Sequence, residues 1–272
     1  MDDRFTFAVV GHNEEATLAN AVAQVSDAVE SGDEVWYIDS ASTDRSAAVA
    51  DSLGVSVVSA PLGKGRAMAT ALARCRDGYM CFVDADLEAS EVNIPQRLRE
   101  VAAASGADMV VGAFHEPKRR LAVTPGLYLP LLRSLFPERV DDLSFPLSGF
   151  RALRTGLPIR PLPPGYGAET HLNVEVPSAG CQLVECELGV FQGNLRDYAN
   201  IPTIGTDVAA ALLDLGEAHG RLAPAARPAW NAWAADVVAV LRSQPPVGAD
   251  DSAYVEDLLA AAARPLPSTR SL

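Results

Sequence analysis

The strongest constraint on the fold is a regular alternation, over residues 1–113, of short apolar segments with segments of helical periodicity. In the first helical segment, residues 14–29, apolar side chains recur on one face. Strands separated by helices of this length form parallel crossovers, so both faces of the sheet are covered. The pattern therefore predicts an α/β fold with a mostly parallel sheet flanked by helices. The predicted strands are 4–10, 34–39, 55–60, 79–83 and 108–114, and the further helices are 42–54, 65–78 and 95–105.

Each of the first four predicted strands is followed by a polar loop. These loops read "GHNEE" (11–15), "DSASTD" (39–44), "PLGKG" (61–65) and "DADLE" (84–88). The carboxyl ends of parallel strands meet at one edge of a sheet, and ligands bind just outside that edge. We therefore expect the four loops to share one rim. Within the second loop and its helix, Ser42 is a predicted N-cap and Gly54 a predicted C-terminal stop.

The chain is less regular beyond residue 113. Residues 114–125 are basic and interrupted by proline, which indicates a loop. The segments that follow are predicted as a helix at 125–136, a strand at 148–154, a proline and glycine turn running into a helix at 161–176, an edge strand at 182–191, two alanine-rich helices and a loose tail at 263–272.

Composition excludes several classes of partner. The 272 residues carry 22 basic and 35 acidic side chains, a formal net charge of −13, which argues against binding to nucleic acid or an anionic membrane. No apolar run is long enough to span a bilayer, and the first residues are acidic where a signal peptide is basic, so we expect a cytoplasmic protein. The four cysteines form no C-x-x-C pair and are predicted to be reduced and buried, and the histidines lack zinc-finger spacing.

The loops lack the motifs of several common α/β enzymes. The first turn reads "GHNEEA" instead of G-x-G-x-x-G, Lys64 is not part of a P-loop, and no G-x-S-x-G elbow occurs. Two carboxylates, Asp84 and Asp86, instead close the fourth strand. Mg²⁺ and Mn²⁺ prefer oxygen ligands, and Mg²⁺ is commonly held by one or two carboxylates together with substrate phosphates. The pair is therefore a candidate metal site, although aspartates are also common in turns.

Several of these stretches, in this order and at these intervals, resemble the GT-A glycosyltransferases of the family-2 type, and among them the glucosyl-3-phosphoglycerate synthases. They are "VVGHNEEATL", "YIDSASTDRS", "PLGKGRAM", "CFVDADLEAS", "LSGFRALR", "PPGYGAETHL" and "ELGVF". The resemblance implies a GT-A fold, which is Rossmann-like, with a smaller acceptor-binding C-terminal part. It divides the chain into a nucleotide-sugar-binding half at 1–113, an acceptor-binding half at 114–215, and C-terminal helices and tail at 216–272.

The resemblance assigns donor binding to the rim loops, at Gly11, Asn13, Glu14, Ser40, Lys64, Asp84, Ala85 and Asp86. It implies that Lys64 meets the diphosphate, that Asp84 hydrogen-bonds the ribose or sugar, and that Asp86 binds the metal. Each residue also has a structural alternative. Asn13 and Glu14 could start a helix, Ser40 could belong to a turn, Lys64 could be a solvated lysine, and Glu169 could cap the helix that follows it.

The acceptor residues implied by the resemblance lie in the second half, at Arg119, Arg120, Thr124, Tyr166, Glu169 and His171. In the family a glycine-rich clamp for phosphoglycerate carries an arginine two residues before a threonine. Here Thr124 matches the threonine, but Ala122 stands at the arginine position. Lys118, Arg119 and Arg120 could bind an oxyanion instead, or form a solvated basic loop. The difference favours a small acceptor other than phosphoglycerate.

The metal site also departs from the family. The family has a metal-binding histidine a few residues after "LGV", and Gly193 stands at that position here. Gln192, Asn194 or His171 could supply a ligand, or the metal could be held by Asp86, phosphates and water alone. We favour the last arrangement, because His171 can equally be a histidine at the edge of the core.

Together these features predict a metal-dependent glycosyltransferase with Mg²⁺ or Mn²⁺ as cofactor. It would move a sugar from a UDP- or GDP-sugar to a small polar acceptor, which could be anionic, using Lys64, Asp86 and Glu169 as catalytic residues, and the resemblance implies retention. In an inverting relative, an acid in the region of Glu169 would be the general base. The alternatives are a sugar-phosphate nucleotidyltransferase, which would need a glycine- and arginine-rich first loop, and a non-catalytic nucleotide-sugar-binding protein. The C-terminal helices could form a homodimer, but the sequence does not determine the oligomeric state.

Overall fold

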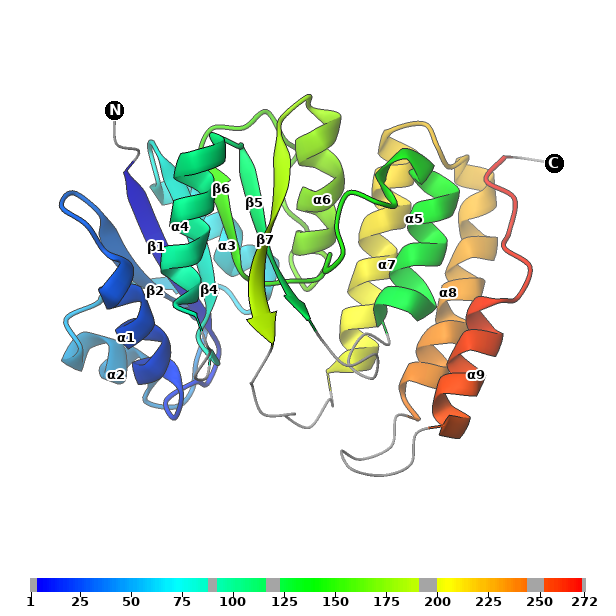
Figure 1. Cartoon of the computed structure of the whole chain (residues 1–272). Coiled ribbons are helices and arrows are strands. Elements are labelled where there is room, and N and C mark those ends of the chain that lie inside the picture. Colours follow the sequence, from blue (N-terminus) through cyan, green and yellow to red (C-terminus); the bar gives the residue numbers. More distant parts are fainter. Residues whose placement is uncertain (1–3, 88–91, 116–122, 191–199, 244–251, 271–272) are drawn as a thin grey trace. The chain divides into compact units, whose positions relative to one another are not determined.

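The computed structural model describes residues 4–87, 92–115, 123–190, 200–243 and 252–270 (Figure 1). The chain forms two compact units. The first consists of Met1–His115, Leu143–Pro164 and Glu175–Asn194, and the second of Glu116–Asp142, Gly165–Val174 and Leu195–Leu272.

The described part of the first unit is built on a seven-stranded sheet of order β3-β2-β1-β4-β6-β5-β7. All neighbouring strands are parallel except β6, which is antiparallel to both β4 and β5. The mostly parallel α/β sheet and the edge position of β7 are therefore confirmed. The strands are β1 Phe5–Gly11, β2 Glu34–Ser40, β3 Ser56–Ala60, β4 Tyr79–Asp84, β5 Met109–His115, β6 Arg151–Arg154 and β7 Leu183–Val190.

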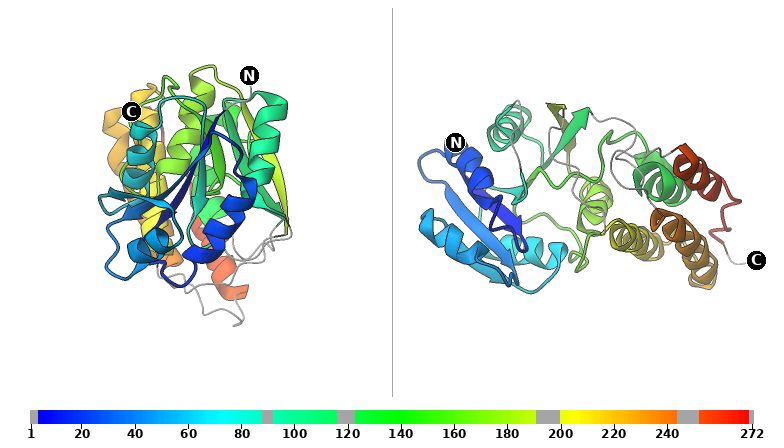
Figure 2. Two further views of the ribbon diagram at one scale, coloured as in Figure 1. Left: turned by 90° about the vertical axis from the view of Figure 1, so that its left-hand side faces the viewer. Right: turned by 90° about the horizontal axis from the view of Figure 1, so that it is seen from below.

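Helices cover both faces of this sheet. They are α1 Leu18–Ala28, α2 Ser46–Ser52, α3 Lys64–Arg74 and α4 Ile94–Ser105. Because the chain runs outward from β1 to β3 and then returns to β4, right-handed crossovers place α3 on the face opposite α1. Helix α4 packs against α1 on the same face, as Figure 2 shows. The predicted cap at Ser42 is wrong, because α2 begins only at Ser46 and the Ser42 hydroxyl accepts a hydrogen bond from the Asn13 amide.

Buried groups fix the end of the sheet at which β1 begins. The Phe5 ring stacks on Tyr79 with 5.0 Å between centroids, and the Arg99 guanidinium lies 4.6 Å above the Phe5 ring. Arg99 also pairs with Asp33, whose other carboxylate oxygen accepts the Phe5 amide at 2.8 Å. This network pairs the charge of a buried arginine and anchors β1, which carries the first rim loop at its far end.

All four cysteines are free thiols. Cys81 and Cys186 are buried, as expected, whereas Cys75 and Cys181 are only partly covered. Burial raises the pKa of Cys186 to about 11 and that of Cys81 further, so both stay protonated and behave as small apolar side chains.

The described part of the second unit is helical. It contains a π-helical turn at Thr124–Tyr128, α5 Leu129–Leu135, most of α6 Ala168–Ser178, α7 Ile201–Ala218, α8 Arg227–Leu241 and α9 Ser252–Ala262, with short 3-10 turns at Pro137–Arg139 and Pro224–Ala226. The predicted helix at 125–136 thus has a π-helical start at Thr124–Tyr128. Gly126 and Gly205 allow close packing, since a Cβ at either would meet Leu258 or Leu241 within 3 Å.

Two expectations for the end of the chain are corrected. Three helices, α7, α8 and α9, occupy the described residues after β7, instead of two. The tail is not loose: the Trp230 indole donates to the Ser268 carbonyl at 3.1 Å, and the Ala223 amide donates to the Thr269 carbonyl at 2.9 Å. No helix in the described ranges combines the length and apolar character needed to cross a bilayer.

Candidate active site

The polar loops after β1, β2, β3 and β4 lie at one edge of the sheet of the first unit. These four strands are mutually parallel neighbours, with Gly11 opposite Asp39, Val10 opposite Asp84 and Ser40 opposite Ala60. Their carboxyl ends therefore meet, and the expectation of a shared rim is confirmed.

The loops after β1 and β4 are in direct contact. A Cβ at Gly11 would lie 2.6 Å from the Ala85 Cβ, and the Ala85 amide donates to the Val10 carbonyl at 2.9 Å. Ala85 is buried, whereas Asp86, in the turn that follows, is exposed. Gly11 and Ala85 thus allow the close approach of the two loops that presents Asp86 to solvent.

Asn13 joins the first loop to the second. Its backbone is left-handed, with φ 58°, and its side-chain oxygen accepts hydrogen bonds from the amides of Thr43 at 2.7 Å and Asp44 at 3.3 Å. In the next position, the Glu14 amide donates to the Ser46 hydroxyl at 2.8 Å. The side-chain oxygen of Asn13 therefore holds the second loop in place, and Asn13 does not start a helix, because α1 begins only at Leu18.

Asp44 completes the contact between these two loops. Partial burial raises the pKa of the Asp44 carboxyl, but hydrogen bonds from Ser46 and from the Glu15 amide outweigh it and hold the pKa below its ordinary value. Beneath them, burial raises the pKa of the Tyr37 hydroxyl, which lies 3.4 Å from Ser42. The contact between the two loops thus rests on an ionised carboxylate, Asp44, and a neutral hydroxyl, Tyr37.

Ser40 joins the second loop to the third. Its side chain is 4% exposed, and its hydroxyl accepts the Gly63 amide at 3.0 Å and lies 3.4 Å from the Pro61 carbonyl. Gly63 has φ 129°, and a Cβ there would lie 2.5 Å from the Pro164 carbonyl oxygen. Ser40 and Gly63 therefore set the path of the chain into the next residue, Lys64.

Lys64 opens α3 and faces the end of β4. Its ammonium lies 3.0 Å from Oδ1 of Asp84, and the two side chains are 20% and 25% exposed. Sequence reasoning placed both residues in the donor site without predicting this ion pair. It also missed Gly149, where a Cβ would lie 2.1 Å from Oδ2 of Asp84. The only signal for Gly149 was its place in the quoted stretch "LSGFRALR".

The predicted acceptor residues that the structure describes belong to the second unit. Glu169 lies in the first turn of α6 and is 4% exposed, and His171 and Thr124 are also buried. Tyr166, in the turn before α6, donates its amide to Oδ2 of Asp207 at 2.8 Å. Asp207, on α7, was not singled out from the sequence. Arg119 and Arg120 fall outside the described residues, as do Lys118, Ala122, Gln192, Gly193 and Asn194.

The chemistry of the β4 end fits a hard divalent cation. Asp84 and Asp86 offer carboxylate oxygens, and Asp86 is exposed. Among the described residues, no group of three or more His, Cys, Asp or Glu side chains is arranged to hold a metal ion. A cation at Asp86 would take further ligands from phosphate and water, as Mg²⁺ commonly does, or from the candidates Gln192 and Asn194, which fall outside the described residues.

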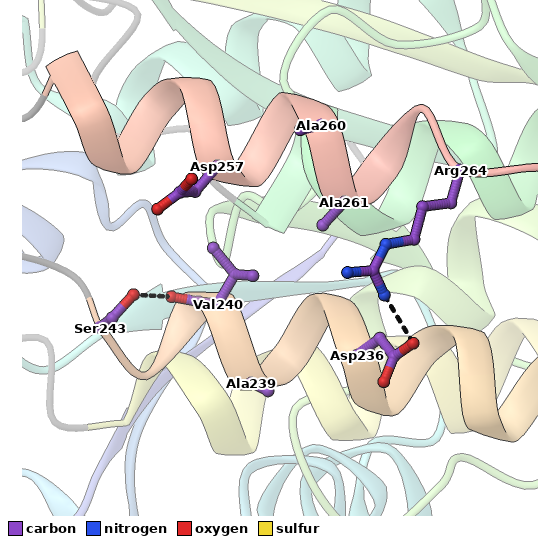
Figure 3. Close-up of a pocket in the computed structure, with 8 residues that line it drawn as sticks. All are labelled: Asp236, Ala239, Val240, Ser243, Asp257, Ala260, Ala261 and Arg264. Atoms are coloured by element: carbon purple, nitrogen blue, oxygen red, sulfur yellow. Dashed lines mark hydrogen bonds and ion pairs between the residues drawn. The ribbon is translucent and has the colours of Figure 1, made fainter.

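A separate open groove of about 460 Å³ runs between α8 and α9 in the second unit (Figure 3). In it, Arg264 points toward Asp236 and pairs with it at 2.7 Å, while Asp257 lies further along α9. None of the residues predicted for donor or acceptor binding lines this groove.

Comparisons with known proteins find relatives of this chain. The glucosyl-3-phosphoglycerate synthase of Mycolicibacterium smegmatis is 29% identical over 226 residues, covering 74% of each chain. The synthase of Mycobacterium tuberculosis is 30% identical over 227 residues, covering 74% of this chain and 70% of the relative.

Solved structures match over a similar length. The crystal structure of the Mycobacterium tuberculosis synthase with Mn²⁺, UDP-glucose and phosphoglyceric acid has a TM-score of 0.68 and 27% identity, covering 79% of this chain and 80% of that one. A second structure of that enzyme, with Mg²⁺ and UDP, has a TM-score of 0.67 and 27% identity, covering 78% and 79%. The family described as "Glycosyl transferase family 2" matches residues 6–152. The chain belongs to this family and is a glycosyltransferase with a GT-A fold.

Proposed function

We propose that this enzyme moves a sugar from a UDP- or GDP-sugar to a small anionic acceptor, with Mg²⁺ or Mn²⁺ as cofactor and with retention at the anomeric carbon. The observation that carries the proposal is the Lys64–Asp84 pair at 3.0 Å, with Asp86 exposed two residues later. It brings a cation and a solvent-exposed carboxylate to the edge of the sheet at which ligands of α/β folds bind.

The relatives support the class of donor and acceptor. The Mycobacterium tuberculosis synthase has been crystallised with Mn²⁺, UDP-glucose and phosphoglyceric acid, so it takes a uridine donor and an acid with phosphate and carboxylate groups. The same donor class and an acceptor with one or two such groups are proposed for this chain. Because Ala122 replaces the arginine of the family clamp, we expect an acceptor other than phosphoglycerate.

The chain's own residues have distinct proposed tasks. Asp86 would hold the divalent cation, which neutralises charge on a diphosphate leaving group when bound. The Lys64 ammonium would stabilise the same charge from the start of α3, where its partner Asp84 keeps it oriented before the donor arrives. Glu169 would orient hydroxyl groups of the sugar or the acceptor.

The test is a transfer assay with mass-spectrometric detection, crossing UDP- and GDP-hexoses with small phosphorylated and carboxylated acceptors in the presence of Mn²⁺. We expect a glycosylated acid whose anomeric configuration, read by NMR, is that of the donor. Asp86→Asn should abolish transfer. Asp77 is also an exposed aspartate, but it lies just before the start of β4, at the opposite end of the strand, so Asp77→Asn should leave transfer unchanged. Full activity of Asp86→Asn, or pyrophosphate release from a nucleoside triphosphate and a sugar phosphate, would contradict the proposal.

A further inference from the structure

The Asp84 carboxylate lies directly against the backbone of Gly149. A Cβ at Gly149 would be 2.1 Å from Oδ2 and 2.6 Å from both Cγ and Oδ1. Rotating the carboxylate about its own axis does not relieve this overlap, because the carbon at its centre is included. To restore ordinary contact, Oδ2 would have to move by about 1.3 Å.

The same carboxylate is engaged on its other side. Oδ1 of Asp84 lies 3.0 Å from the Lys64 ammonium, and both side chains are about three-quarters covered. The carboxylate therefore occupies a slot between an ammonium group and a backbone that has no side chain. A displacement of an ångström or more would lengthen this ion pair beyond direct contact.

The turn that carries Gly149 is more firmly held than the carboxylate. Arg151 is fully buried and donates through Nε, at 3.2 Å, and Nη2, at 2.5 Å, to the Ser148 carbonyl. On the other side, the Phe150 carbonyl accepts the Gly112 amide at 2.8 Å. A methyl group at Gly149 would therefore move Asp84 and leave the turn in place.

The backbone conformation does not by itself require glycine at this position. The φ of Gly149 lies outside the left-handed region that favours glycine, in contrast to Gly156 at φ 75°. Only the approach of Asp84 explains the absence of a side chain. The need for glycine at position 149 thus comes from the Asp84 carboxylate and not from the backbone conformation.

We propose that Gly149 is a positioning residue of the donor site. By leaving space for Asp84, in a turn fixed by Arg151, it sets the place of the Lys64 ammonium that meets the donor diphosphate. The inference rests on the proposed function for the identity of that diphosphate, but the contact between Gly149 and Asp84 can be tested without it.

The test is a double-mutant cycle of wild type, Gly149→Ala, Asp84→Ala and the double variant, measured by Tm and by calorimetric titration with UDP without added metal. In the presence of Asp84, we expect Gly149→Ala to lower Tm by about 5 °C and UDP affinity by about 10-fold. In the Asp84→Ala background the same change should alter Tm by about 1 °C or less and affinity by less than about twofold, because the clashing group is gone.

A matched control is Gly156→Ala, since a Cβ there meets nothing within 4 Å. It should cost the same small amount of stability in both backgrounds and leave UDP affinity unchanged.

An equal effect of Gly149→Ala on Tm with and without Asp84 would overturn the inference. If Gly149→Ala fails to fold, folding of the double variant supports it and failure of both overturns it. If wild type binds no UDP, the proposed function fails while the Tm cycle still decides the positioning role.

Discussion

Substitutions at Asn13 test whether the rim depends on the contact between its first two loops. Asn13 has φ 58°, a conformation that costs other L-residues about 1–2 kcal/mol and that asparagine and glycine tolerate better. Its side-chain oxygen accepts the amides of Thr43 and Asp44. Because these amides are partly solvated, we assign the two bonds together about 1 kcal/mol. Asn13→Ala should thus lower the free energy of unfolding by about 2 kcal/mol and Asn13→Gly by about 1 kcal/mol. Asn13→Asp retains the acceptor and should leave the free energy of unfolding nearly unchanged.

The assay is chemical denaturation of the four proteins, with the midpoint and its slope fitted for each. The predicted order of stability is asparagine and aspartate first, then glycine, then alanine. Donor affinity should follow the same order, because the second loop leads through Ser40 to Gly63 and the loop that carries Lys64. Equal stability of the alanine and aspartate variants would refute the reasoning, since it would mean that neither the backbone conformation nor the acceptor matters.

Two further predictions concern Asp44 and Asp207. The folded pKa of Asp44 lies below the ordinary 3.8, so its contribution to stability is present above that value and is lost as pH falls through the folded pKa. Asp44→Asn should therefore flatten the Tm–pH curve below pH 3.8 relative to wild type, and an unchanged curve would exclude this role. Asp207→Ala removes the acceptor of the Tyr166 amide and should lower Tm by about 3–6 °C and impair acceptor binding. Asp214→Ala, which removes an exposed ion pair from the same helix, should do neither.

Local periodicity was sufficient to predict the first part of the fold. The apolar spacing of α1, with Leu18, Val22 and Val25 buried on one face, and the short apolar runs of β1–β5 are properties of neighbouring residues. Parallel crossovers then follow from the length of the helical segments that separate the strands. The shared rim could be predicted for the same reason, since it depends only on strand direction.

Long-range contacts could not be predicted in this way. The insertion of β6 between β4 and β5, antiparallel to both, depends on which strands pair across the sheet. The end of the chain looked loose because its proline-rich sequence has no helical or strand period, yet backbone carbonyls of Ser268 and Thr269 accept hydrogen bonds from distant residues. Such bonds leave no trace in the local sequence.

The same limit applies to the site. Lys64 and Asp84 were both candidates, but their ion pair joins the start of α3 to the end of β4, and such a contact between elements is not visible in the sequence. Ser40 and Asn13 were assigned to donor binding, and the structure shows that their side-chain oxygens also accept hydrogen bonds from neighbouring loops. Gly149 carries no chemical group, so only the position of Asp84 reveals why it is glycine. The roles proposed for the donor and acceptor residues stay predictions.

The central claim is that a divalent cation at Asp86 and the Lys64 ammonium hold a nucleoside diphosphate at the β4 end of the rim. The most direct measurement is a crystal structure of the protein with MnCl₂ and UDP, with the manganese located by its anomalous scattering. The account predicts a manganese peak at coordination distance, about 2.0–2.5 Å, from an Asp86 carboxylate oxygen, with the diphosphate in contact with Lys64. A manganese ion and diphosphate bound away from these two side chains would contradict it.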